Sequence, residues 1–441
     1  MTVPFALPGD LVQFRIKRRG RKTKIETVKI ERAESYPTDL GLAEPFCPHH
    51  GTCGGCRAQH LSYETQISLK TDPIVARMSE RYAITPEILR APAVSGHRNR
   101  MDFVVDGTTI GLRPAGDFST YVDIAACGVQ REPANRVLAL VRELLAAHPE
   151  TGFRRAADED DAGDPCGPLK YATIRTGPSS GVLVLTIVPE LAESGTGGDA
   201  YAKFIEDLRA RLPEAISDAS IVECHVDRKN EQSCVPGGRV LMGSAGYLES
   251  LGGVEFQVPY DSFFQPNPPA FDLLLGWCRE ALREPIGESE SPGPLLDLYC
   301  GAGVLSAVFT SFFPDAFNGI RGYEFTESAV ARAPENLGHF KGAMDFRAMD
   351  LNKPEEGILS EGESPRLVIM DPPRAGISPK LAAHITTARP SPWILYISCN
   401  PDSQLRDLKE LEDAYRPVSA CIADCYPQTP HLEQAVLLRR V

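Results

Sequence analysis

Trp393-Ile-Leu-Tyr-Ile-Ser-Cys-Asn-Pro401 is an apolar run that ends abruptly in a thiol, an amide and a proline. Such a run predicts a strand that is buried on both faces of a parallel sheet. The carboxyl ends of parallel strands are where α/β enzymes place their chemistry, so a thiol there is poorly placed for plain core packing. Cys399 is therefore a candidate nucleophile, with a buried structural cysteine as the alternative.

The sequence on either side of this run alternates between strand and helix signals. Two more apolar stretches end in conspicuous motifs, Asp297-Leu-Tyr-Cys-Gly-Ala-Gly303 and Asp371-Pro-Pro-Arg-Ala-Gly376. This alternation predicts a doubly wound α/β domain from about residue 261 onward. Within it, a helix and a Gly/Ser/Pro/Glu-rich linker at 287–293 precede the alternating strands and helices. Its expected helix is 270–282, and its expected strands are 295–299, 319–324, 367–370, 393–397 and 435–438.

The composition is that of an ordinary globular protein with more than one domain. The chain has 441 residues, of which 42% are hydrophobic and 24% charged, and a single core rarely extends over so many residues. No apolar stretch is long enough to span a membrane, and residues 1–10 do not resemble a signal peptide. We therefore expect a cytoplasmic protein without a membrane partner.

The charge is unevenly distributed. The formal net charge is −13, yet nine Lys or Arg and only two Glu lie between Gln13 and Arg32. A local positive patch attracts phosphate whatever the charge of the whole chain, so this segment is a candidate RNA contact, and a solvated surface hairpin is the alternative.

The first 260 residues predict two β-rich units. Alternating apolar and polar residues at 9–36 predict a small basic β unit, which we bound at residues 1–40. Residues 41–260 are expected to form a central domain, and residues 261–441 the α/β domain. Within the central domain we expect a cysteine-rich loop at 41–60, helices at 61–82 and 135–147, an acidic insertion at 155–168, a loop at 192–199, and strands at 102–106, 109–113, 171–175 and 181–188.

The glycine-rich turn and the Asp-Pro-Pro-Arg loop predict a nucleoside-type cofactor site. Small residues let the backbone approach a nucleoside closely, and Glu324, at the end of the next strand, can accept hydrogen bonds from ribose hydroxyls. The dinucleotide fingerprint is incomplete because Ser306 takes the place of its last glycine. The two prolines after Asp371 make a rigid loop that can present a carboxylate and Arg374.

Cys399 needs a partner if it is to act as a nucleophile. Peptidase chemistry would require a positioned histidine, and neither His384 nor His431 lies in a recognisable peptidase motif. Glu433, just before the last strand, could act instead as a general base.

A separate group of cysteines predicts a metal centre. Cys47-Pro-His-His-Gly-Thr-Cys-Gly-Gly-Cys56 places three thiols within ten residues, and Cys127, also followed by glycine, is the best fourth ligand. Sites rich in thiolates hold either zinc or an iron–sulfur cluster, and the spacing leaves both open.

Taken together, these motifs resemble the RNA uridine C5-methyltransferase family that uses S-adenosyl-L-methionine, and more closely its iron–sulfur branch, which modifies 23S rRNA. The resemblance covers nearly the whole chain. It implies a [4Fe–4S] cluster, because the family's iron–sulfur segment is matched by Cys47, Cys53, Cys56, Gln59, Tyr63, Gln66 and Lys70, and its fourth ligand falls on Cys127. It also implies a Rossmann-like methyltransferase domain, a central domain that carries the cluster, and an abbreviated form of the RNA-binding TRAM barrel at the N-terminus.

The same resemblance assigns roles at the active site. Cys399 matches the nucleophile and Glu433 the base. The implied cofactor contacts are Gln265, Tyr299, Glu324, Asp350 and Asp371, whereas Val304 stands where the family often has asparagine. The implied reaction is methylation of uridine C5 through a covalent Cys399–C6 adduct, by a monomer and with 23S rRNA as the favoured substrate. The alternatives are the T-loop uridine of tRNA, a non-catalytic iron–sulfur RNA-binding protein, and a zinc-binding regulator.

Overall fold

The computed structural model describes residues 6, 9–19, 22–31, 33, 40–117, 120–154, 167–193, 195–287, 291–355, 357–388 and 390–441, with the backbone alone at 17–19 and 22–28. The acidic insertion expected at 155–168 falls almost entirely outside these residues. Among the described helices, none combines the length and the apolar character that crossing a bilayer would require.

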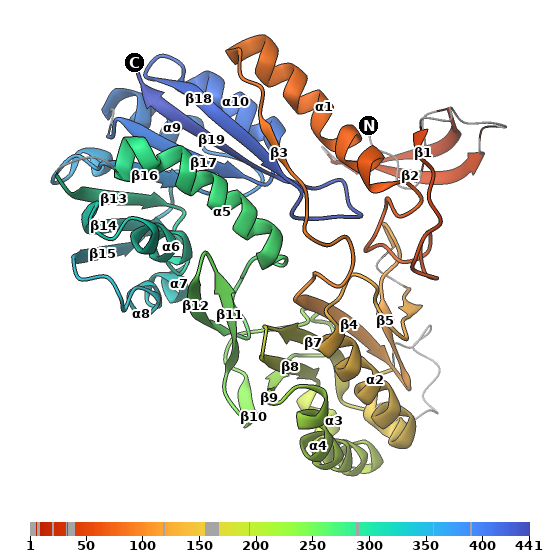
Figure 1. Cartoon of the computed structure of the whole chain (residues 1–441). Coiled ribbons are helices and arrows are strands. Elements are labelled where there is room, and N and C mark those ends of the chain that lie inside the picture. Colours follow the sequence, from red (N-terminus) through yellow and green to blue (C-terminus); the bar gives the residue numbers. More distant parts are fainter. Residues whose placement is uncertain are drawn as a thin grey trace.

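The C-terminal half forms most of an open, twisted eight-stranded sheet, whose strands are drawn in green to blue in Figure 1 except for the orange β3. Five strands run parallel, β19 runs antiparallel between β17 and β18, and the short β3 pairs in parallel with β18. The strand order reverses at β13, the topological switch point at which doubly wound sheets bind ligands. The order is β15 (Ala343–Ala348), β14 (Phe317–Glu324), β13 (Gly293–Leu298), β16 (Leu367–Met370), β17 (Trp393–Ser398), β19 (Glu433–Arg440), β18 (Tyr415–Ala423) and β3 (Glu87–Leu89).

Both faces of this sheet are covered, as the continuous apolar runs predict. On β17, Leu395 and Ile397 join one core cluster, whereas Ile394 and Tyr396 join the cluster on the opposite face. Helices α5 (Pro268–Leu282) and α6 (Val304–Phe312) pack on the first face. Helices α1 (Tyr63–Tyr82), α9 (Pro379–Ala388) and α10 (Pro401–Leu411) pack on the second. The predicted doubly wound α/β domain is therefore confirmed.

The central part of the chain forms a second, seven-stranded sheet. Helices α2 (Glu132–Ala147), α3 (Pro189–Ala192) and α4 (Gly195–Ala215) accompany it. The predicted loop at 192–199 is wrong beyond residue 194, because α4 begins at Gly195; its glycines hid a helix whose Tyr201, Phe204 and Leu208 are buried at helical spacing. The strand order is β10 (Arg239–Met242), β9 (Asp218–His225), β8 (Ser180–Ile187), β7 (Leu169–Thr176), β4 (Arg100–Asp106), β5 (Thr109–Leu112) and β6 (Val122–Asp123).

Two segments do not pack with their neighbours in the sequence. Helix α1 precedes the central sheet in the chain, yet its Ile74 and Met78 are buried against the C-terminal sheet, which β3 extends at the edge. Figure 1 shows α1 and β3 in orange beside the blue C-terminal strands. The hairpin of β11 (Gly246–Leu251) and β12 (Val254–Pro259) joins the two large sheets, and its Tyr247 and Phe256 lie in the core that both share.

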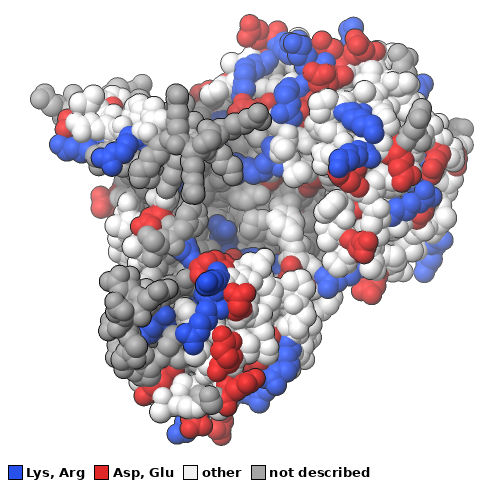
Figure 2. Space-filling model, turned by 180° about the vertical axis from the view of Figure 1, so that it is seen from behind, with Lys and Arg blue, Asp and Glu red and all other residues white. Residues whose placement is uncertain are grey.

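The N-terminal unit is an antiparallel ribbon of β1 (Leu11–Arg19) and β2 (Lys22–Glu31), as expected from its alternating pattern. From behind, the surface is hollowed between the ribbon and the parts of the molecule that hold the two large sheets, and Lys and Arg side chains lie among the atoms around this hollow (Figure 2).

Candidate active site and cysteine centre

A cavity of about 460 Å³ opens at the switch point of the C-terminal sheet, at the carboxyl ends of β13, β14 and β16. Its lining includes four of the five predicted cofactor contacts: Gln265, Tyr299, Glu324 and Asp371. The fifth, Asp350, is not among the lining residues; its carboxylate accepts hydrogen bonds from the backbone and side chain of Asn352. Asp350 nonetheless lies close enough to Tyr299 to help raise the pKa of its phenol.

The turn after β13 shapes the floor of this cavity. Tyr299 adopts a positive φ of 66°, which is unusual for a residue with a side chain, and Gly301 and Gly303 follow with φ of 54° and 71°. The end of β14 is tied to this turn, because Glu324 accepts a hydrogen bond from the Gly301 amide at 3.2 Å and another from the Thr326 amide at 3.0 Å. Val304, which begins α6 in place of asparagine, lines the cavity with an apolar side chain.

Two carboxyl groups lie close together at the cavity: Asp371 lines it, and Asp297 is buried near Asp371. Asp297 is 1% exposed and accepts a hydrogen bond from the Ser306 hydroxyl at 2.6 Å. Burial raises the pKa of Asp297 to about 7, and burial together with Asp297 raises the pKa of Asp371 to about 7. The Ser306 that interrupts the dinucleotide fingerprint is thus the partner of Asp297. Neighbouring carboxyl groups oppose each other's ionisation, whereas a nearby cation favours the ionised form of both. The pair therefore favours a cationic ligand in the cavity.

The cavity also offers unsatisfied hydrogen-bonding groups. Within the described structure, Gln265 Oε1, Asp297 Oδ1 and the Tyr299 hydroxyl are buried without a hydrogen-bond partner. Buried polar atoms usually have hydrogen-bond partners. The lack of partners for these three atoms therefore points to a ligand with several polar groups. These residues fit the positively charged, nucleoside-containing methyl donor that the sequence implies.

Cys399 and Glu433 face each other across two neighbouring strands. In the antiparallel register of β17 and β19, Ile397 pairs with Ala435 and Ser398 with Gln434, so the next pair in line is Cys399 and Glu433. Asp371 ends the adjacent strand β16 at the same edge of the sheet. The structure thus brings together the predicted nucleophile, the predicted base and a predicted cofactor contact, which are up to 62 positions apart in the sequence.

Burial makes both members of this pair harder to ionise in the free protein. Burial raises the pKa of Cys399 to about 11, and the negative charges of Glu433 and Asp371 add to the effect, opposed by Arg374. Glu433 is 3% exposed, and burial, followed by Asp371, raises its pKa well above the usual range. A carboxylate with a raised pKa is a stronger base toward a carbon-bound proton.

Cys399 opens into a second cavity, of about 680 Å³, with a basic lining. The cationic residues around it are Arg57, Lys70, Arg77 and Arg374. His431 lies there too, but its ring contacts Arg374 at 3.2 Å, and burial, reinforced by Arg374, lowers its pKa to about 4. In the described part of the chain no hydrogen bond joins Cys399 to a histidine, and His384 lies on α9 away from either cavity, which argues against a peptidase.

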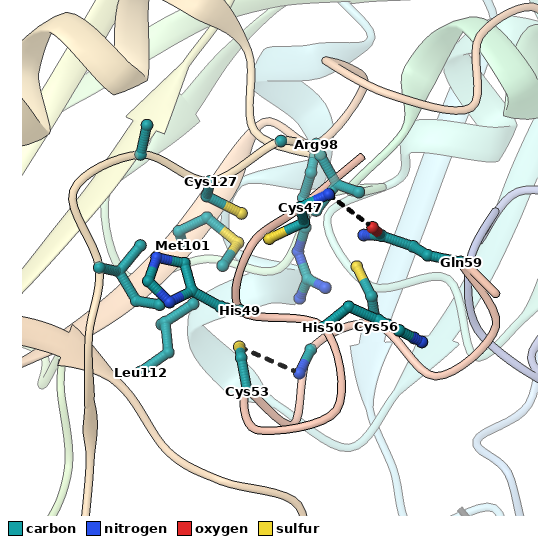
Figure 3. Close-up of a pocket in the computed structure, with 15 residues that line it drawn as sticks. Cys47, His49, His50, Cys53, Cys56, Gln59, Arg98, Met101, Leu112 and Cys127 are labelled. Atoms are coloured by element: carbon teal, nitrogen blue, oxygen red, sulfur yellow. Dashed lines mark hydrogen bonds between the residues drawn. The ribbon is translucent and has the colours of Figure 1, made fainter. Parts of the chain in front are cut away.

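The four predicted ligand cysteines converge on a third, small cavity. Cys47, Cys53, Cys56 and Cys127 all line it, as Figure 3 shows. Their loop is held by the Cys47 amide, which donates to Gln59 Oε1 at 3.0 Å, and by the Cys127 amide, which donates to Asn135 Oδ1 at 2.9 Å. A Cβ on Gly54 would meet the backbone of Ala115 at 2.9 Å, so glycine is needed where the loop presses on that segment.

The cysteine cavity offers four candidate thiol ligands. No group of three or more His, Cys, Asp or Glu side chains that could hold a metal ion is found among the residues that the structure describes. Thiolate-rich sites hold either zinc or an iron–sulfur cluster. The lining of this cavity by four thiols selects neither of them.

The sequence did not connect Glu433 with the residues around it: Tyr426 was not singled out, and Lys70 was named only within the segment that resembles the family's iron–sulfur segment. The Tyr426 hydroxyl donates to Glu433 Oε1 at 2.8 Å, and the buried Lys70 ammonium pairs with Asp424 at 2.8 Å. Tyr426 follows a strand and precedes a proline, a setting in which a tyrosine raises no functional expectation. A lysine at a largely apolar position of α1 is the one signal that could have drawn attention to this network.

Comparisons with known proteins find RNA methyltransferases. Residues 356–441 match the family described as tRNA (Uracil-5-)-methyltransferase. An uncharacterised RNA methyltransferase of Leptospira interrogans is 31% identical, over 99% of this chain and 92% of that protein. The tRNA (uracil(54)-C(5))-methyltransferase of Pyrococcus horikoshii is 28% identical, over 98% of this chain and 93% of that protein.

A solved structure has the same fold. That of the tRNA (uracil-54, C5)-methyltransferase of Pyrococcus abyssi, in complex with S-adenosyl-L-homocysteine, superimposes with a TM-score of 0.68 at 24% identity, over 99% of this chain and 94% of that one. The sheet, its switch-point cavity and its acidic floor define a Rossmann-like methyltransferase. The chain belongs to the S-adenosylmethionine-dependent RNA uridine C5-methyltransferase family.

Proposed function

We propose that this enzyme methylates C5 of a uridine in RNA through a covalent adduct between Cys399 and C6 of the base. The observation that carries the proposal is the pairing of Cys399 with Glu433 at a sheet edge where Cys399 lines one cavity and Asp371 lines another. One cavity is acidic beneath and suits the methyl donor. The other is lined with arginine and lysine and suits the RNA strand.

The reaction needs a nucleophile because uracil C5 is too electron-poor to take a methyl group unaided. Cys399, as the thiolate, forms a bond to C6 and moves the C5–C6 electron pair onto C5. That carbon takes the methyl group, which S-adenosyl-L-methionine supplies as an electrophile on its sulfonium. Glu433 then removes the C5 proton, the double bond re-forms, and the bond between Cys399 and C6 breaks. Splitting the substitution in this way replaces one difficult step by several easier ones.

The chain's own residues set up these steps. Gln265, Tyr299, Glu324 and Asp371 would hold the donor, with Asp350 near the Tyr299 hydroxyl, and Arg374 would hold the nucleic acid beside Cys399. The target base must leave its stack to reach Cys399, so a loop or a flipped nucleotide is the substrate.

The RNA class is a separate part of the proposal. The cysteine centre and the basic ribbon underlie our preference for 23S rRNA. Transfer RNA is the second candidate, because the relatives from the two Pyrococcus species are named as tRNA (uracil-54) enzymes. We further propose that the enzyme works as a monomer in the cytoplasm.

The cysteine centre is proposed to be a [4Fe–4S] cluster held by Cys47, Cys53, Cys56 and Cys127. Such a cluster would shape the RNA-facing surface, and nothing in the mechanism passes electrons through it. A zinc-binding regulator would carry one metal ion per chain and no inorganic sulfide, which metal and sulfide analysis of anaerobically prepared protein would reveal.

Labelled S-adenosyl-L-methionine and unmodified total RNA test the function directly. We expect 5-methyluridine at one position in 23S rRNA, whereas label in the tRNA T-loop would select the second candidate. Glu433→Gln should accumulate a denaturation-resistant RNA–protein adduct, Cys399→Ala should form none, and Cys234→Ser, which alters a partly buried thiol outside the three cavities described above, should behave like the parent. Binding of the methyl donor without transfer to any RNA would instead indicate a non-catalytic RNA-binding protein. Normal turnover by Glu433→Gln would exclude Glu433 as the base.

A further inference from the structure

The segment 424–429, between β18 and β19, carries the residue in direct contact with the base. Tyr426 is half-buried there, and its hydroxyl donates to Glu433 Oε1 at 2.8 Å. Its ring also meets that of His431 edge-on, with the centroids 6.2 Å apart. Removing the hydroxyl alone would leave this ring contact intact, so the hydrogen bond can be tested separately from packing.

Helix α1 holds this segment by two buried contacts. The Lys70 ammonium bonds Asp424 at 2.8 Å and the Tyr426 carbonyl at 3.1 Å, and the side chains of Lys70 and Asp424 are 6% and 2% exposed. One turn earlier, Gln66 makes a paired contact with Gln428: its amide donates to Gln428 Oε1 at 3.0 Å, and it accepts from the Gln428 backbone at 3.1 Å.

Two more parts of the chain form hydrogen bonds with segment 424–429. The Arg57 amide, one residue after the cluster ligand Cys56, donates to the Gln428 carbonyl at 2.7 Å. Asn267, at the start of α5, donates to the Cys425 carbonyl at 3.1 Å. Gln428 keeps a positive φ of 67°, a conformation that costs free energy unless neighbouring contacts impose it. Contacts from other parts of the chain therefore fix the conformation of segment 424–429.

We propose that Tyr426 is a positioning residue of the methyl-transfer site, whose hydroxyl holds the Glu433 carboxylate in one orientation and favours its ionised form, and that α1 and the cysteine-rich loop hold Tyr426 in place. The inference rests on the proposed function, since it concerns the base of that reaction. Under this inference the cysteine centre affects catalysis only by holding the segment in place through the contact between Arg57 and Gln428, and it takes no part in making bonds.

The ionisation of Glu433 reflects opposing neighbours. The charged and titratable groups that face it are Asp371, Arg374, Cys399, Cys425 and Tyr426. Burial and Asp371 raise the pKa of Glu433, whereas the Tyr426 hydrogen bond and Arg374 lower it. A hydrogen bond to a carboxylate is worth about one pH unit of its pKa.

The test compares Tyr426→Phe with Tyr415→Phe, which deletes a hydroxyl at the far end of the same strand-loop-strand unit, where it donates to the Ser391 carbonyl. In Tyr426→Phe the apparent pKa on the acid side of the kcat–pH profile should rise by about one unit. Turnover should therefore fall about tenfold at pH values below this pKa and recover at higher pH. The covalent adduct should accumulate at low pH, because proton removal follows adduct formation. Tyr415→Phe should keep the parent profile.

A second variant guards against a folding defect. Gln66→Met removes the paired contact with Gln428 by a neutral exchange of similar size, and it should shift this apparent pKa in the same direction while the Tyr426 hydroxyl remains. A profile for Tyr426→Phe that superimposes on the parent, or one lowered equally at every pH, overturns the inference and leaves the proposed function standing. Absence of 5-methyluridine with the parent enzyme overturns both.

Discussion

The ionisation of Cys399 gives the sharpest test of the site's electrostatics. Burial, with Glu433 and Asp371 nearby, raises its pKa to about 11. An unperturbed cysteine has a pKa of about 8.5, so at pH 7.5 the native protein should hold about 300-fold less thiolate at this position. The resting enzyme would therefore carry a protected thiol, which becomes a nucleophile only when RNA alters its surroundings.

Alkylation of the RNA-free protein by iodoacetamide measures this thiolate. The rate at the peptide that contains Cys399, followed by mass spectrometry, should rise about tenfold per pH unit and reach no plateau below about pH 10. The same peptide in urea, where the pKa is ordinary, should plateau near pH 9 and serves as the control. Glu433→Gln removes a neighbouring negative charge and should speed alkylation at pH 8. A plateau by pH 8.5 in the native protein would refute the assigned environment.

Three other perturbations follow from buried charges and from the cysteine centre. Lys70→Met should lower the free energy of unfolding by about 3–5 kcal/mol in urea titrations, because it leaves Asp424 charged and buried; adding Asp424→Asn should restore part of the loss. Affinity for S-adenosyl-L-methionine should fall about tenfold between pH 8 and pH 6 by calorimetry, since Asp371, whose pKa lies at about 7, becomes protonated. S-adenosyl-L-homocysteine, which lacks the sulfonium charge, should change less, and equal changes for the two ligands would contradict this role. Cys127→Ser should lose the bound iron and sulfide measured by elemental analysis while keeping cofactor affinity, whereas full metal content would remove Cys127 from the ligand set.

The C-terminal sheet shows how far local sequence can predict this fold. Four of its strands could be placed because each holds a short apolar run buried on both faces, as at Leu367–Met370 and Trp393–Ser398. Strand β14 was also placed, although its sequence mixes polar and apolar residues. Strand β15, Ala343–Ala348, escaped prediction because it lies at the sheet edge with mostly exposed residues and lacks such a run. Helix α4 escaped because its glycine-rich start resembles a loop, although tertiary packing of its apolar face stabilises it.

Local sequence predicts the chemical groups that this protein can use: a cysteine at a strand end, acidic residues after neighbouring strands, and four cysteines in glycine-rich turns. Those features are local, since a strand end and a turn are encoded by the residues that form them. Which of these groups meet depends on the tertiary structure. The register of β17 and β19 places Cys399 opposite Glu433, and the docking of α1 onto the C-terminal sheet brings Lys70 and Gln66 to a segment more than 350 residues away. Such contacts depend on the burial of apolar surface across the whole sheet, a sum over distant residues to which no single motif corresponds.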